Sequence, residues 1–252
     1  MTYKDYFSKQ ASNYARFRPR YPKDLFKYLA LISPGRHLAW DCATGSGQAA
    51  AGLARYFKKV IASDASPRQI DQGQRIPNVE YRVAKAEDSG LADASVDLIS
   101  VAQALHWFDL DTFFRETDRV LKPGGILAAL TYAFMTISPG VDAVMERFHK
   151  EIVGPYWPPE RAMVEERYAG IRFPFEPPLQ TPEFRMSSRW DLEHFCGYLR
   201  SWSAVQCFRT ANGSDPLDLI LEDLIDAWGE ASGTNVITWS LTVIIRKKEE
   251  TA

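Results

Sequence analysis

The stretch Trp40-Asp41-Cys42-Ala43-Thr44-Gly45-Ser46-Gly47-Gln48 decides the fold of this 252-residue chain. It joins an apolar run over residues 37–41 to an alanine-rich run over residues 48–57, which predicts a strand followed by a helix. Gly45 and Gly47 permit a tight turn and let a ligand approach the backbone closely. The start of the following helix offers free N–H groups and a positive dipole end to an anionic group. The loop alone is a weak signal, because glycines also occur at such turns for geometric reasons.

Outward from this loop, strands and helices alternate along the chain. After a helix that begins near Pro22, the patterns predict strands over residues 37–41, 59–63, 79–83, 96–101, 126–131, 184–187 and 236–245, with helices between most of them. Such alternation implies right-handed crossovers and a mostly parallel sheet. We therefore expect an α/β fold with a doubly wound, seven-stranded, mostly parallel, Rossmann-like sheet. The last strand is expected to be inserted antiparallel.

A single domain is expected over residues 1–252, because a chain of this length that is 46% hydrophobic can build one full core. Residues 1–36 form an N-terminal helical leader, and residues 37–135 form a cofactor-binding core. Residues 136–182 are expected to form a helical, proline-rich cap insertion, because residues 155–182 carry seven of the 15 prolines and no clear strand. Residues 183–252 supply the strands and helices that complete the sheet.

Cysteine content and hydropathy argue against several classes of protein. Three cysteines without C-x-x-C spacing favour a reducing cytoplasm over a disulfide framework. No apolar stretch approaches the roughly 18 residues that span a bilayer, and the polar start MTYKDYFSKQ predicts no secretory signal. Glu146-x-x-His149 has no second copy with which to share a metal ion, so we expect no metal site.

Positive charge is concentrated in the leader. Residues 1–36 hold eight basic and two acidic residues, a charge of +6, and leave 22 basic and 30 acidic residues, or −8, for the rest of the chain. A basic leader can bind nucleic acid, but an acidic body lacks the positive field that such binding uses. We expect the leader to pack on this body or to line a site for an anionic ligand. Neither nucleic acid nor a membrane is expected as a partner, and the oligomeric state is left open.

A second acid, Asp64, ends the next predicted strand, 23 residues after Asp41. A carboxylate there can accept hydrogen bonds from both ribose hydroxyls of a nucleoside, so the loop and this acid together predict a nucleoside-bearing cofactor. NAD is one alternative, because Gly45-x-Gly47-x-x-Ala50 also satisfies a permissive dinucleotide fingerprint. Asp41 argues against NAD, since a pyrophosphate needs no carboxylate there, whereas a zwitterionic amino acid has an ammonium group for one. The helical leader before the first strand argues the same way.

These residues resemble a known family. The loop, followed by Asp64, by Ala86-Glu87-Asp88 and by Leu121-Lys122-Pro123-Gly124-Gly125, is similar to class I S-adenosylmethionine-dependent methyltransferases with a methyltransferase type 11 domain. Ala43 departs from the family pattern, because it stands where the first glycine of G-x-G-x-G is usual. Alanine is small, so we expect binding of the cofactor to survive.

Two further stretches narrow the resemblance. The pattern Phe7-Ser8-x-x-Ala11-x-x-Tyr14-x-x-Phe17-Arg18-Pro19-x-Tyr21-Pro22 and the run Gln103-Ala104-Leu105-His106-Trp107-Phe108-Asp109 resemble the group related to trans-aconitate methyltransferases. Several matched segments in the right order make this likeness specific.

The resemblance implies a role for each matched residue. Asp41, Ala43, Gly45 and Gly47 would hold the methionine part of S-adenosylmethionine, Asp64 the ribose, and Ala86 and Glu87 the border of the adenine. Gln103 and His106 would stand where the methyl group meets the acceptor, and Tyr14 and Arg18 belong to a leader that closes over the cofactor. His106 is the candidate catalytic residue, as a proton acceptor; the alternative is a histidine packed at the start of a helix.

The sequence therefore predicts a cytoplasmic methyltransferase that acts on a small molecule. An NAD-dependent oxidoreductase and a non-catalytic S-adenosylmethionine-binding protein are the alternatives. A carboxylate oxygen is the acceptor we favour, because Arg16, Arg18 and Arg20 lie in the leader and a guanidinium donates two parallel hydrogen bonds to a carboxylate. An ionised carboxylate also needs no base. The competing interpretation is that these arginines pair with the acidic body.

Overall fold

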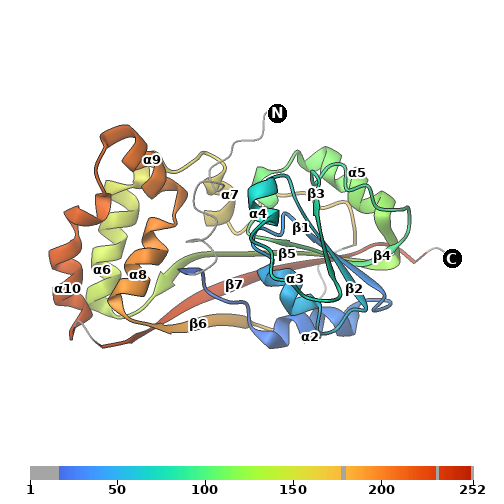
Figure 1. Cartoon of the computed structure of the whole chain (residues 1–252), viewed down its shortest axis with the longest axis horizontal. Helices are drawn as coiled ribbons and strands as arrows, with labels where there is room; N and C mark the ends of the chain where they lie inside the picture. Colours follow the sequence, from blue (N-terminus) through green and yellow to red (C-terminus); the bar gives the residue numbers. More distant parts are fainter. Residues whose placement is uncertain (1–16, 177–179, 231–232, 251–252) are drawn as a thin grey trace.

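The computed structural model describes residues 17–176, 180–230 and 233–250. Their strands form one sheet in the order β3-β2-β1-β4-β5-β7-β6 (Figure 1). The first five strands in this order are parallel, and β7 runs antiparallel to both β5 and β6. The predicted seven-stranded, mostly parallel, doubly wound sheet is thereby confirmed. The strands are β1 (Leu38–Cys42), β2 (Lys59–Asp64), β3 (Val79–Val83), β4 (Val96–Ala102), β5 (Leu121–Thr136), β6 (Phe184–Trp190) and β7 (Asn235–Lys247).

Helices cover both faces of the parallel half of the sheet. Consecutive side chains of a strand point to opposite faces, and those of these strands are mostly apolar, so both faces need cover. Leu98 of β4 belongs to a core shared with α2 (Lys23–Ile32) and α3 (Gln48–Leu53). Its neighbour Ile99 belongs to a second core with α5 (Leu110–Val120). Both cores are built from side chains that are almost wholly buried. The remaining helix of this half, α4 (Pro67–Ile70), follows β2.

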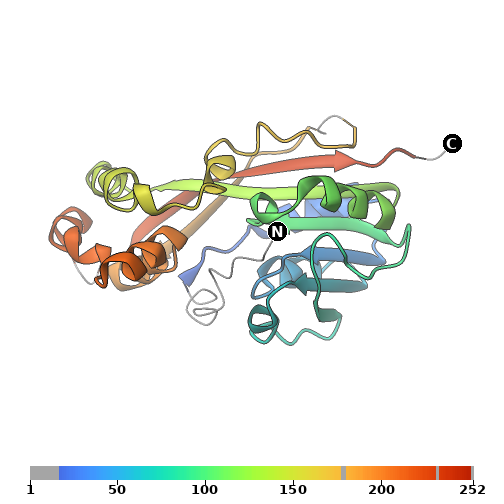
Figure 2. The same cartoon turned by 90° about the horizontal axis from the view of Figure 1, so that it is seen from above.

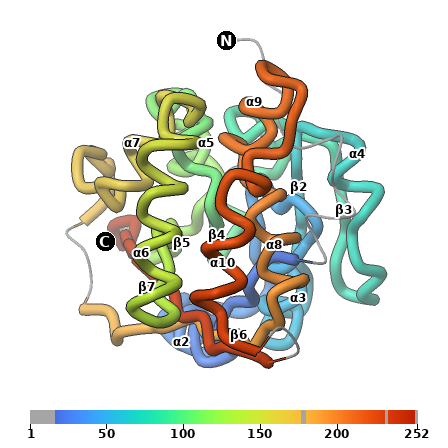
Figure 3. The backbone as a smooth tube through the Cα atoms, turned by 90° about the vertical axis from the view of Figure 1, so that its left-hand side faces the viewer, coloured from blue at the N-terminus to red at the C-terminus, as the bar shows by residue number. Residues whose placement is uncertain are grey.

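A second group of helices lies at the β6–β7 end of the sheet (Figures 1 and 3). The long strands β5 and β7 connect it to the parallel half, as Figures 1 and 2 show. Aromatic rings fill its interior; Phe195 stacks on Trp228 with ring centroids 5.2 Å apart. The group contains α6 (Pro139–Arg147), the π-helical turn η3 (Phe148–Ile152), η4 (Gly154–Tyr156), α8 (Leu192–Arg200), α9 (Ser203–Asn212), η5 (Pro216–Leu219) and α10 (Leu221–Trp228). The short helix α7 (Arg161–Glu165) lies between this group and the parallel half in Figure 1. The short helix η2 (Leu105–Trp107) precedes α5 in the chain. No helix of the described residues is long and apolar enough to cross a membrane.

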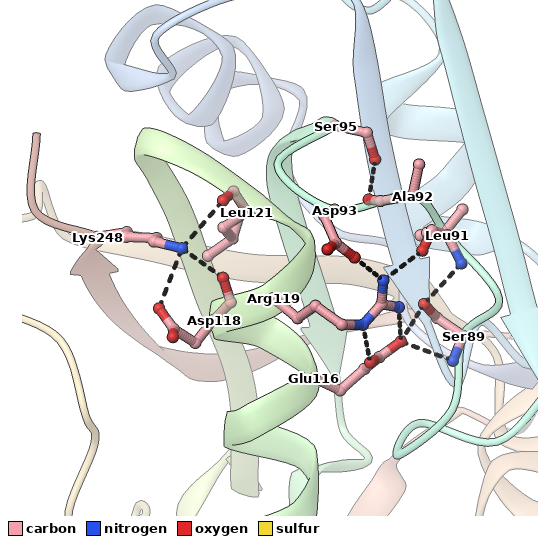
Figure 4. Close-up of polar contacts among 10 residues, drawn as sticks. All are labelled: Ser89, Leu91, Ala92, Asp93, Ser95, Glu116, Asp118, Arg119, Leu121 and Lys248. Atoms are coloured by element: carbon pink, nitrogen blue, oxygen red, sulfur yellow. Dashed lines mark hydrogen bonds and ion pairs between the residues drawn. The ribbon is translucent and has the colours of Figure 1, made fainter. Parts of the chain in front are cut away.

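A polar network ties the loop before β4 to the end of α5 (Figure 4). Glu116 is buried and accepts hydrogen bonds from the backbone N–H, at 2.9 Å, and the hydroxyl of Ser89. The Arg119 guanidinium donates to both oxygens of Glu116, at 2.7 and 2.8 Å, and to Asp93 at 2.5 Å. This network anchors the chain just after residues 86–87, which border the cavity described next.

Candidate active site

A cavity of about 990 Å³ opens at the carboxyl ends of the parallel strands. Its wall is built from residues that follow β1, β2, β3 and β4, and from Tyr132 of β5 and Arg18 of the leader. β1 lies between β2 and β4, so the cavity spans the point where the strand order reverses. Open α/β sheets bind ligands at this point. The volume falls in the range of small-molecule and cofactor sites.

The loop after β1 is held in a left-handed conformation at three positions. Ala43, Gly45 and Gly47 have φ angles of 53°, 56° and 85°. An alanine in this region costs roughly 1 kcal/mol more than a glycine, yet Ala43 keeps the backbone that a glycine would adopt. Any other residue at position 47 would clash, because its Cβ would lie 2.2 Å from the hydroxyl oxygen of Tyr81.

Asp64 is a wall residue that fixes the loop to β2. It is 9% exposed, and its two oxygens accept hydrogen bonds from the backbone N–H groups of Gly45 and Ser66, both at 2.9 Å. Asp64 therefore holds the loop while its carboxylate borders the cavity.

Asp41 lies behind the loop and is not part of the cavity wall. It is fully buried, and its Oδ2 accepts hydrogen bonds from the Thr44 hydroxyl at 2.5 Å and from the backbone N–H of Ala50 at 2.9 Å. Its Oδ1 has no hydrogen-bond partner among the described residues. Burial raises the pKa of Asp41 to about 7. Through these contacts Asp41 supports the loop. Its carboxyl group stays protonated to a higher pH than an exposed aspartate does.

An Asp41→Asn variant is expected to remove a pH-dependent loss of stability from the cofactor-free protein. The native carboxyl binds its proton up to about pH 7, whereas in the unfolded chain it is released near pH 4. The native state therefore holds more protons in this window, and wild-type stability falls as pH rises through it. The loss at pH 8 is at most roughly 4 kcal/mol, at about 1.4 kcal/mol for each pKa unit. Thermal unfolding at pH 5, 6, 7 and 8 measures it; parallel curves for the two proteins would contradict the prediction.

A second, smaller chamber of about 50 Å³ adjoins the cavity. Arg18, Gln103, Trp107 and Tyr132 line both, so they form the wall between them. No carboxylate lines the chamber among the described residues, whereas four line the cavity. The other chamber residues are aromatic, basic or small: His106, Ala133, Phe134, His149, Trp157, Pro158, Arg161, Tyr198, Trp202 and Ser203.

Arg18 lies at the junction of the two spaces. Its guanidinium donates to the backbone carbonyl of Ser201 at 3.1 Å and to the Tyr132 hydroxyl at 3.5 Å, and it lies 5.5 Å from the centre of the Tyr198 ring. Arg20 is exposed. Arg16 and Tyr14 lie outside the described residues. Of the leader arginines that the structure describes, Arg18 alone lines the two spaces.

Gln103 forms a rigid part of the shared wall. Its backbone N–H donates to Leu130, its side-chain amide donates to the carbonyl of Tyr132 at 2.8 Å, and its amide oxygen accepts from the Thr131 hydroxyl at 2.6 Å. These bonds hold it at a φ of 56°. Non-glycine residues in such strained conformations cluster at functional sites.

His106 lines the chamber and not the cavity. Its Nδ1 lies 3.0 Å from the Tyr168 hydroxyl oxygen. Burial, and then the charge of Arg161, lower the pKa of His106 to about 3. The imidazole is therefore neutral at physiological pH and is a weak proton acceptor.

The structure brings most of the predicted site residues together. Those that line the cavity are Arg18, Ala43, Gly45, Asp64, Ala86, Glu87 and Gln103. His106 lines the chamber, Asp41 and Gly47 lie behind the wall, and Tyr14 is outside the described residues. Sequence reasoning missed Gln69 and Arg161, because neither belongs to a motif. Trp107 lies within the quoted Gln103–Asp109 run and could have been singled out.

Comparison with known proteins finds similarity to proteins named as methyltransferases. A family model for a methyltransferase domain matches residues 40–129. A protein of Dictyostelium discoideum named as a methyltransferase is 36% identical, and the alignment covers 97% of this chain and 95% of that protein. A Saccharomyces cerevisiae protein named as an S-adenosylmethionine-dependent methyltransferase is 23% identical over 96% of each chain. The structure of a type II methyltransferase from Anaeromyxobacter dehalogenans is 45% identical, has a TM-score of 0.87, and matches over 93% of this chain and 100% of its own.

Proposed function

Because the chain belongs to the class I S-adenosylmethionine-dependent methyltransferases, we propose that it methylates a carboxylate oxygen of a small molecule. The chamber beside the cofactor cavity carries this proposal, since Arg18 and Arg161 line it and no carboxylate of the described residues does. The leader and the Gln103–Asp109 run, which resemble the group related to trans-aconitate methyltransferases, support it further. The relatives give no support to an NAD-dependent oxidoreductase or to a non-catalytic binding protein.

The cavity suits S-adenosylmethionine. A Cβ built on Gly45 would meet a single atom, Gln69 Oε1, and that only at 4.0 Å, so the loop leaves room for a ligand against its backbone. We assign Ala43 and Gly45 to the methionine part, Asp64 to the ribose, and Ala86 and Glu87 to the border of the adenine. Asp41 and Gly47 support the loop from behind, and Tyr14 remains a prediction for the leader.

The bound cofactor supplies an activated methyl group, which an ionised carboxylate oxygen accepts as the carbon–sulfur bond breaks, without any proton transfer. The chain therefore needs chiefly to align the two reactants and to exclude water. Gln103 and Tyr132 form a fixed wall where the two spaces meet, and aromatic rings surround the chamber. An ionised carboxylate carries no proton, so the reaction does not need His106 as a base. We assign it a place in the chamber wall, beside the acceptor.

Arg161 is the second cation of the chamber. Its Nε donates to Glu165 at 2.7 Å, and its guanidinium carbon lies 4.6 Å from the centre of the Trp157 ring. The aromatic face and the carboxylate hold the group in place while it faces the chamber. Arg18 and Arg161 together give this otherwise aromatic space an attraction for anions.

An Arg18→Gln variant is expected to raise the KM for carboxylate acceptors by roughly 10-fold or more, because a hydrogen bond to a charged group contributes about 1.5–3 kcal/mol. Arg20→Gln is the matched control, since Arg20 is exposed, and its KM should stay at the wild-type value. The assay measures release of S-adenosylhomocysteine with a panel of small di- and tricarboxylates, phenols and amines. The KM for S-adenosylmethionine is measured alongside, because Arg18 also lines the cofactor cavity. Activity confined to phenols or amines and indifferent to Arg18→Gln would discard the carboxylate.

A further inference from the structure

Gln69 is a cavity residue that neither the sequence motifs nor the roles assigned above include. It lies on the short helix α4, which begins after Ser66, and the Ser66 hydroxyl accepts from the Gln69 backbone N–H at 3.4 Å. The side chain is only 4% exposed. It points to the loop after β1, with Oε1 4.0 Å from the position that a Cβ on Gly45 would take, and it lines the cofactor cavity.

The amide oxygen of Gln69 is buried and has no hydrogen-bond partner among the described residues. The nearby N–H of Gly45 donates to Asp64. Most buried polar atoms in native proteins are paired, and an unpaired one costs about 1–3 kcal/mol. The Gln69 amide oxygen is therefore available to accept a hydrogen bond from a molecule in the cavity that Gln69 lines.

We propose that Gln69 is a cofactor-binding residue whose Oε1 accepts a hydrogen bond from a ribose hydroxyl of S-adenosylmethionine. Asp64 is the last residue of β2 and Gln69 lies on α4, the next helix, and both side chains lie near Gly45. The two side chains thus direct acceptor oxygens to one part of the cavity, and a ribose offers two neighbouring hydroxyl donors. Asp64 is also bonded to two backbone N–H groups, so Gln69 supplies a separate, uncharged acceptor.

Binding of S-adenosylhomocysteine and of 5′-methylthioadenosine by calorimetry tests this assignment. 5′-Methylthioadenosine carries the nucleoside and lacks the amino-acid part. A Gln69→Met variant should bind both ligands roughly 10-fold more weakly, the loss of one hydrogen bond of about 1.4 kcal/mol. The cofactor-free variant should unfold at the wild-type temperature or above, because no unpaired oxygen remains. Gln72→Met is the matched control, since Gln72 follows on the same turn and is exposed.

Gln69→Glu keeps an acceptor oxygen at the same reach and should retain most of the affinity. Wild-type affinity of Gln69→Met for both ligands, or a loss for S-adenosylhomocysteine alone, would overturn the proposal. A purely structural role would instead lower the unfolding temperature of Gln69→Met. The inference rests on S-adenosylmethionine as cofactor and not on the carboxylate acceptor, and no acceptor is present in the assay. Its failure is therefore distinguishable from failure of the proposed function.

Discussion

A Gly47→Ala variant is expected to lose at least 100-fold in affinity for S-adenosylhomocysteine and roughly 3 kcal/mol in the free energy of unfolding. Gly47 has a φ of 85°, where any Cβ is strained by about 1 kcal/mol. The added Cβ would also lie 2.2 Å from the hydroxyl oxygen and 3.0 Å from Cζ of Tyr81, and forced packing of this kind costs about 1–3 kcal/mol. The Tyr81 ring also packs closely against Gly73, where a built Cβ would lie 2.6 Å from it, so the ring has little room to move. The loop must therefore shift, and with it the backbone that faces the cofactor.

Gly90→Ala is the matched control for this variant. Gly90 also has a positive φ, of 65°, but a Cβ there would meet nothing within 4 Å. The control should lose about 1 kcal/mol of stability from the backbone alone and bind S-adenosylhomocysteine normally. Calorimetry gives the affinities and urea unfolding the stabilities. If Gly47→Ala bound the ligand within threefold of wild type, the contact between the loop and Tyr81 would not set the shape of the site.

Asp64→Ala is expected to weaken binding of S-adenosylhomocysteine by about 1–3 kcal/mol, the range for losing hydrogen bonds to a charged partner. Two effects combine. The ribose loses its charged acceptor, and the backbone N–H groups of Gly45 and Ser66 lose theirs, which loosens the loop. Gly45→Val should bind still more weakly, because a branched side chain in a left-handed turn obstructs both the turn and the ligand.

Asp71→Ala is the control for Asp64→Ala, since Asp71 is the C-cap residue that follows α4 and is exposed. Calorimetry of the three variants at one pH separates the effects. Normal binding by folded Asp64→Ala and Gly45→Val proteins would place the cofactor elsewhere.

The strand pattern predicted the fold well because buried parallel strands are short apolar runs separated by turns and helices. The ends of individual strands and helices were harder to predict. β5 continues five residues past the predicted end, to Thr136, since it pairs there with β7 beyond the parallel half. The apolar residues between Leu217 and Trp228 have helical spacing throughout, but the helix is interrupted at Ile220, whose φ of −129° is not helical. Contacts between elements decide where such strands and helices end, and the periodicity of the sequence carries no information about these contacts.

Most residues that line the larger cavity could be predicted from motifs, whereas most residues of the smaller chamber could not. The loop after β1 and the acid at the end of β2 could be predicted because the backbone turn requires glycines at set positions and the strand end fixes the position of the acid. Arg161 comes from a proline-rich segment without periodicity, and only the fold brings it beside Arg18. The contact of Gly47 with Tyr81 also joins residues 34 positions apart. The charge of the leader predicts an anionic ligand, which stays a prediction, and it did not indicate which arginine would line the chamber.

The chemical form of the transferred methyl group tests the central claim most directly. The enzyme is incubated with S-adenosylmethionine labelled in the methyl carbon and with the carboxylate that gives the highest rate, and the product is then treated with mild alkali. Methyl esters hydrolyse under these conditions, whereas methyl groups on nitrogen, carbon or a phenol oxygen do not. We predict that the label is released as volatile methanol. Label that stays on the product after alkali would contradict methylation of a carboxylate oxygen.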